Sequence, residues 1–99
     1  MKHDNMTRTR LFVGLETAEN HATIAPEEVI GYIKQFVDAG TFYESLGLWK
    51  GETENSIVFE VMDFNSNSDI ALSELKEGLE EEFSQDSVMI EETGVGVSF

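Results

Sequence analysis

The run from residue 57 to residue 64, IVFEVMDF, is apolar on both of its faces if it forms a strand. Successive side chains of a strand point to opposite faces of the sheet, and here the odd and the even positions are both mostly apolar. A sheet with helices on one side and water on the other would alternate apolar with polar residues. We therefore expect the second face to meet another copy of the chain or a partner. The candidate anchors of this self-interface are Phe12, Val58, Met62 and Phe64.

The rest of the chain alternates strand patterns with two amphipathic helix patterns. Pro26 suits the first turn of a helix, because its missing N–H has no partner inside the helix there. The predicted order is β-α-β-β-α-β, a ferredoxin-like α+β domain with an antiparallel sheet and two helices on one face. We predict a flexible tail over 1–7 and one domain over 8–99. The expected elements are strands at 8–16, 41–50, 57–64 and 88–92, and helices from 26 and over 69–83.

The chain is strongly acidic, with 20 acidic and six basic residues among 99 and a formal net charge of −14. Such a field repels phosphate backbones, anionic lipids and free nucleotides, so direct nucleic-acid binding is not expected. Three explanations stay open: adaptation to a high-salt cell or its virus, solubility, and a surface that imitates nucleic acid. A surface that imitates nucleic acid would bind a basic, nucleic-acid-binding protein.

The absence of cysteine excludes disulfides and thiol chemistry, and it favours a cytoplasmic setting. No apolar run approaches the about 20 residues that a membrane span needs. The first residues lack the apolar stretch of a signal peptide. Neither histidine has an acid or cysteine at metal-ligand spacing, and no Gly-x-Ser-x-Gly elbow or glycine-rich phosphate loop occurs. The sequence therefore points away from an enzyme.

An acidic ridge runs along the predicted second helix. Glu77 and Glu81 are four residues apart, so they lie on one helix face and repel one another, while Lys76 can pair with Glu80. The ridge is either a solvated surface or a contact for a basic protein. We predict a non-enzymatic, homo-oligomeric interaction module, a homodimer through the sheet face, that binds its partner through Glu74, Glu77 and Glu81.

The alternative function is a small-molecule-binding protein or weak enzyme with a pocket between two paired sheets. Its lining would be Arg10, Tyr43, Trp49 and Glu54. Arg8 and Arg10 share one strand face, where they either pair with acids on neighbouring strands or clamp an anion. Aromatic residues such as Trp49 also serve as core or interface residues.

Residues 63–74 resemble the calcium-binding loop of the EF-hand family. Asp, Asn and Asn occupy the first, third and fifth positions, and a glutamate occupies the twelfth. Ser68 stands where the family has a glycine, and a strand precedes the segment where the family has a helix. Such residues also cluster in loops because they cap helices. The resemblance implies calcium as a possible cofactor, with Asp63, Asn65, Asn67 and Glu74 as ligands.

A second resemblance spans roughly residues 7–62. The segments TRLFVG at 9–14, GLWK at 47–50 and ENSIV at 54–58 are similar to an Arg-x-Leu-Phe-x-Gly, Gly-x-Trp and Glu-x-Ser pattern. That pattern belongs to a family of small uncharacterised bacterial and phage α+β proteins. The resemblance implies an α+β fold and no known activity, and it draws attention to Trp49, Glu54 and Ser56.

Overall fold

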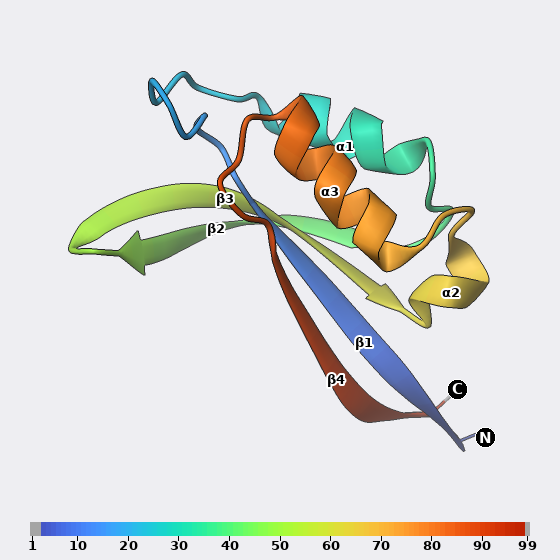
Figure 1. Ribbon diagram of the computed structural model, residues 1–99. Helices are drawn as coiled ribbons and strands as arrows, with labels where there is room; N and C mark the ends of the chain where they lie inside the picture. Colours follow the sequence, from blue (N-terminus) through green and yellow to red (C-terminus); the bar gives the residue numbers. More distant parts are fainter. Residues whose placement is uncertain (1–2, 99) are drawn as a thin grey trace.

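The structure is a computed structural model that describes residues 3–98 (Figure 1). Over these residues the chain forms four strands and three helices. The elements are β1 (His3–Gly14), α1 (Pro26–Lys34), β2 (Thr41–Trp49), β3 (Glu52–Met62), α2 (Phe64–Asn67), α3 (Leu72–Glu82) and β4 (Met89–Ser98).

The four strands form one antiparallel sheet in the order β2-β3-β1-β4. Helices α1 and α3 lie side by side over one face of this sheet, and the opposite face carries no helix (Figure 1). This order, with the last strand beside the first, is the ferredoxin-like arrangement. The predicted fold class is therefore confirmed.

The core lies between the helices and the covered face of the sheet. Leu11 and Val13 of β1 are fully buried there, opposite Val29 of α1 and Leu79 of α3. Each buried side chain of this size contributes about 1.5–3 kcal/mol through removal of apolar surface from water. The covered face therefore holds both helices on the sheet, and the side chains of the other face can serve other roles. From β3 the core receives Ile57, Phe59 and Val61.

The helices begin without side-chain caps. Pro26 is the first residue of α1, as predicted, with Glu27 and Glu28 in the first turn, where carboxylates stabilise the positive end of the helix dipole. Helix α3 is shorter than the predicted 69–83, and the preceding loop contains the short helix α2.

The prediction that Phe64 lies on the open face of the sheet is wrong. β3 ends at Met62, and Asp63 adopts a left-handed conformation with φ 52° that interrupts the alternation of the strand. Phe64 therefore turns into the core, where it is only 5% exposed.

The prediction of a flexible tail over residues 1–7 is also wrong for the residues that the structure describes. Residues 3–7 are the first part of β1, and they pair with β4 from Gly94 to Ser98. β4 runs through Gly94 and Gly96 without a break, because backbone pairing with β1 holds those glycines extended. Met1, Lys2 and Phe99 lie outside the described residues.

Two-stranded ribbons extend from the sheet at opposite ends (Figure 1). The β2–β3 hairpin continues past the last pair between β1 and β3, Gly14 with Ser56. Its two-residue turn has positive φ at Lys50 and Gly51, the conformation of the tight turns that join twisted strands. The β1–β4 ribbon continues past Arg8, which pairs with Met62. These ribbons make the molecule long, with extents of 49 × 29 × 20 Å.

Within residues 3–98, no helix is long and apolar enough to cross a membrane.

Candidate functional site

A row of apolar side chains crosses the open face of the sheet. The pairing places Tyr43 beside Val58, Val58 beside Phe12, and Phe12 beside Met89. Val58 is fully buried by these neighbours, whereas Tyr43 is 39% and Met89 is 56% exposed. Of the predicted self-interface anchors, Val58 is therefore inaccessible, Phe12 is half-buried, and Met62 is exposed. Self-association through this face stays a prediction.

The next row of the open face consists of small residues. Ser45 pairs with Ser56, and Ser56 pairs with Gly14 at the end of β1. Beyond this row, Glu54 lies on the same face of β3, opposite Gly47. We name the residues of these two rows and Glu54 the open-face patch: Phe12, Gly14, Tyr43, Ser45, Glu54, Ser56, Val58 and Met89.

The side chain of Glu54 reaches across β3 to the end of β1. A Cβ atom at Gly14 would overlap Glu54 Oε1, and it would lie 2.9 Å from Gln85 Oε1. Only a glycine leaves both oxygens in these positions. Among the described residues, none donates a hydrogen bond to the half-buried Glu54 carboxylate.

Gln85 fixes the end of β1. Its Oε1 accepts a hydrogen bond from the Gly14 N–H at 3.0 Å, and its Nε2 donates to the carbonyl oxygens of Glu16 at 2.9 Å and Phe83 at 3.1 Å. No local sequence pattern pointed to Gln85, because it lies 71 residues from Gly14 in the chain.

Arg10 lies on the open face but is occupied. Its Nε donates to Glu60 on β3 at 2.6 Å, and its Nη1 donates to Glu91 on β4 at 3.1 Å. The hydrogen bond with Glu60 raises the pKa of Arg10. Arg8 adds a weaker contact, with 3.8 Å between its Nε and Glu60 Oε1. Cross-strand pairing, one of the two alternatives for these arginines, is therefore present.

The predicted pocket residues are only partly brought together. Tyr43 and Glu54 share the open face of the β2–β3 hairpin, and Arg10 lies further along the same face, bound to acids. Trp49 pairs with Glu52 at the end of the hairpin, and its side chain lies outside what the structure describes.

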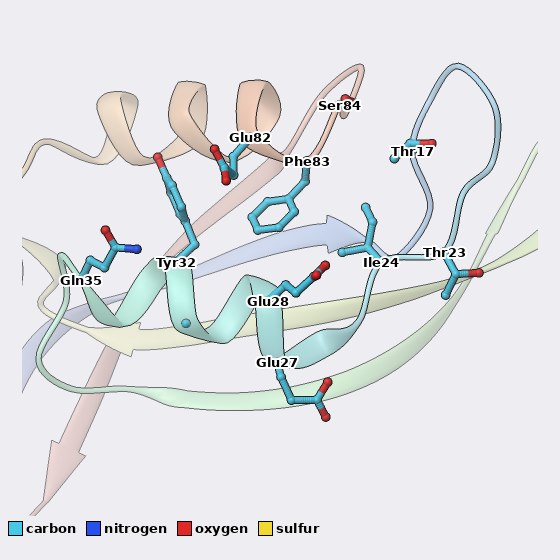
Figure 2. A pocket seen from close by; sticks show the side chains of 11 residues that line it. Thr17, Thr23, Ile24, Glu27, Glu28, Tyr32, Gln35, Glu82, Phe83 and Ser84 are labelled. Atoms are coloured by element: carbon cyan, nitrogen blue, oxygen red, sulfur yellow. The ribbon is translucent and has the colours of Figure 1, made fainter.

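A cleft of about 550 Å³ lies on the other side of the molecule, between α1 and the end of α3 (Figure 2). Tyr32 rises from α1 towards α3, and its ring meets Phe83 edge-on with 5.8 Å between the ring centroids. Glu27, Glu28 and Glu82 line the cleft, and no cationic side chain does. No sequence pattern predicts this cleft, because its walls come from separate segments of the chain. The other lining residues are Thr17, Thr23, Ile24, Gly31, Gln35 and Ser84.

The predicted acidic partner face is exposed along α3, at Glu74, Glu77 and Glu81. Glu80 does not belong to it. Glu80 accepts hydrogen bonds from Lys76, as predicted, and from the Val88 N–H at 2.8 Å. These bonds, first of all the one from Lys76, lower the pKa of Glu80.

The predicted calcium ligands do not form a loop of alternating oxygens, because residues 64–67 fold into helix α2. The Asp63 carboxylate accepts a hydrogen bond from the Ser66 hydroxyl, and the Asn67 amide donates to the carbonyl oxygens of Met62 and Asp63. Among the described residues, no three histidine, cysteine or acidic side chains are grouped to hold a metal. Calcium binding here stays a prediction from the sequence.

No known protein family and no curated protein matches this sequence. Two solved structures share its fold, and both are of a phage SAM (S-adenosylmethionine) lyase. The structure in complex with S-methyl-5′-thioadenosine has a TM-score of 0.63 and 19% identity, over 95% of this chain and 90% of that chain. The apo structure has a TM-score of 0.64 and 23% identity, over 96% of this chain and 90% of that chain.

This comparison contradicts the prediction of a non-enzymatic module that binds a protein through Glu74, Glu77 and Glu81. Both similar structures are of an enzyme, and one of them holds a small molecule. The prediction failed because net charge reports on association and solubility and does not identify an active site. At 19–23% identity these structures show the fold of this chain, and the alternative function, a small-molecule-binding protein or weak enzyme with a pocket between two paired sheets, stays a proposal.

Proposed function

We propose that the protein is an enzyme that binds S-adenosylmethionine at the open-face patch and releases S-methyl-5′-thioadenosine. The observation that carries this proposal is the Glu54 carboxylate, which lies over Gly14, two rows from the aromatic ring of Tyr43, and receives no hydrogen bond from the residues that the structure describes. The shared fold with a phage SAM lyase supports it.

The chemistry of the substrate fits this arrangement. S-adenosylmethionine combines a flat adenine ring with a sulfonium cation and a primary ammonium group. Aromatic side chains such as Tyr43 and Phe12 stack on flat rings and attract cations, and a carboxylate such as Glu54 binds a cation directly. The small residues between them, Ser45 and Ser56, leave room for the ribose.

The charge of the whole chain acts in the same direction. A net charge of −14 repels nucleotides that carry phosphate, but S-adenosylmethionine has no phosphate and carries a net positive charge. The field of the protein therefore concentrates this substrate near its surface and raises its rate of association. Arg10 does not oppose this, since Glu60 and Glu91 neutralise it.

A second copy of the chain would complete the site. The open face has no helix over it, and Tyr43, Met62 and Met89 are exposed large apolar residues on it. Exposed apolar patches of this kind mark interfaces, and a small-molecule site buries most of its ligand. The homo-oligomer predicted from the sequence would supply the missing wall.

The reaction breaks one bond of the substrate. Release of S-methyl-5′-thioadenosine cleaves the bond from the sulfonium sulfur to the γ-carbon of the amino-acid chain, and the electron pair goes to sulfur, which becomes neutral. The γ-carbon takes its new bond from the carboxylate oxygen of the same chain, so the amino-acid part leaves as a five-membered lactone. The role of the protein is to hold the chain in the reactive conformation and to exclude water from it. Glu54 is the residue that would hold the cationic part of that chain.

The test is to incubate the purified protein with S-adenosylmethionine and to measure S-methyl-5′-thioadenosine by liquid chromatography and mass spectrometry. We expect time-dependent release by the natural chain, and a loss of at least about tenfold in kcat/KM for Glu54→Gln, because a charge-assisted contact is lost. Glu44→Gln is the matched control, since Glu44 lies on the same hairpin and faces the opposite way. The absence of both product release and saturable nucleoside binding would contradict the proposal.

A further inference from the structure

The end of β1 brings together two oxygen acceptors from distant parts of the chain. Glu54 Oε1 comes from the β2–β3 hairpin, and Gln85 Oε1 comes from the turn that follows α3. Both oxygens lie against Gly14, in the space that a Cβ atom would occupy. This meeting point belongs to the open-face patch.

The orientation of the Gln85 amide is determined by its own hydrogen bonds. Its Nε2 donates to two carbonyl oxygens, those of Glu16 and Phe83, so the nitrogen cannot change places with Oε1 without losing both bonds. At Gly14, Gln85 therefore presents only an acceptor. One lone pair of Oε1 takes the Gly14 N–H, and the other stays available.

The Glu54 carboxylate beside it has no donor among the described residues. The nearest arginine on the same face, Arg10, donates to Glu60 and Glu91. A half-buried carboxylate without a donor among the described residues, beside an amide oxygen with one lone pair available, repels an anion and favours a group with several N–H bonds and positive charge. Two oxygens are too few for Ca²⁺, which takes 6–8 oxygen ligands.

We infer that Glu54 and Gln85 together bind the primary ammonium group of the substrate. This inference rests on the proposed function and deepens it, because it assigns the amino-acid end of S-adenosylmethionine to the end of β1. The adenine ring then lies towards Tyr43. Gly14 is a positioning residue, since any side chain at this position would displace the Glu54 carboxylate.

Two nucleosides separate this inference from the proposed function. S-adenosylhomocysteine carries the ammonium group, and S-methyl-5′-thioadenosine has a methyl group in place of the whole amino-acid chain. We expect Glu54→Gln to weaken the binding of S-adenosylhomocysteine by at least about tenfold in isothermal titration calorimetry. Binding of S-methyl-5′-thioadenosine should change by less than about twofold, and Glu44→Gln should leave both unchanged.

A second variant tests the geometry while keeping the charge. Gly14→Ala retains Glu54 but pushes its carboxylate aside, so it should cause the same selective loss. Its melting temperature, compared with that of the natural chain, checks that the fold is retained. Restoration of S-adenosylhomocysteine binding by the paired variant Gly14→Ala with Glu54→Asp, whose shorter side chain avoids the added methyl group, would support the positioning role.

Equal losses of both nucleosides in Glu54→Gln would overturn the ammonium inference and leave the proposed function standing. Failure of the natural chain to bind either nucleoside would overturn the proposed function, and the inference that rests on it would fall with it.

Discussion

The two faces of the sheet are built from the same strands, yet they differ in what their side chains do. On the covered face, Leu11, Val13 and Phe59 are buried in one apolar cluster with residues of the two helices. The open face changes its chemistry over a few residues. Along it follow the ion pairs of Arg10, an apolar row, a row of small residues and the Glu54 carboxylate. The covered face stabilises the fold, and the open face is where chemistry can vary without loss of the fold.

β3 shows how one strand serves both faces. Ile57, Phe59 and Val61 enter the core, whereas Glu54, Ser56 and Val58 belong to the open-face patch. Because side chains alternate strictly along a strand, a change on one face leaves the other in place. The comparison between the faces can therefore be tested by single substitutions on each of them.

The largest expected effect is a loss of stability on the covered face. Leu79→Ala removes a fully buried side chain between α3 and the sheet, so it should lower the free energy of unfolding by about 2–5 kcal/mol. Met89→Ala, on the open face, should cost less than about 0.5 kcal/mol in dilute solution. Urea unfolding of both variants measures the difference. A cost at Met89 that grows with protein concentration would show that the open face is buried between copies.

The second expected effect is on association. If the open face meets another copy, the natural chain should show a molar mass that is a multiple of 11.1 kDa. Met89→Glu should shift it towards the monomer, because the interface would then bury an unpaired charge. Light scattering on a sizing column at low and high salt measures this. Glu92→Gln serves as a control on the same strand, and a monomeric natural chain would remove the second copy from the proposed site.

The fold could be predicted from alternation and helix signals because these report on the covered face. The start of α1 at Pro26 was predicted, and the apolar alternation at Ile57, Phe59 and Val61 matches their burial, since burial against helices leaves a periodic pattern. The predictions for Phe64 and for residues 3–7 failed. A left-handed φ at Asp63 and backbone pairing along a ribbon leave no such pattern.

The site could be predicted only in part. Tyr43 and Glu54 were named as pocket residues, but Gly14 and Gln85 were not, because tertiary contact alone brings them together. The proposed class of function leaves no motif in the sequence, because a site for a cationic nucleoside needs no phosphate loop, metal cluster or catalytic triad. The charge of −14 was assigned to a protein partner, although it bears only on association and solubility.

A smaller effect is expected from Glu80, which holds the residue before β4 through the Val88 N–H. Loss of its hydrogen bonds should lower the free energy of unfolding by about 1 kcal/mol. Lys76 and the Val88 N–H hold the pKa of Glu80 below its ordinary value of 4.5. Glu80 therefore contributes stability above its unfolded-state pKa, and this contribution is lost as the pH falls through the lower folded-state pKa. Urea unfolding from pH 7 downwards should show a smaller decrease for Glu80→Gln than for the natural chain. Equal decreases would contradict the assignment.

The smallest expected effect concerns the outer surface of α3, which belongs to neither face of the sheet. Glu77 and Glu81 are exposed and four residues apart, so Glu81→Lys replaces a repulsion by an attraction and should stabilise the helix by about 0.2–0.5 kcal/mol. Nucleoside binding and the release of S-methyl-5′-thioadenosine should change by less than about twofold, because the helices separate this surface from the open-face patch. Thermal unfolding at low salt and the product assay measure the two quantities. A loss of activity without a loss of stability would place part of the function on α3 and would weaken the division of roles between the two faces of the sheet.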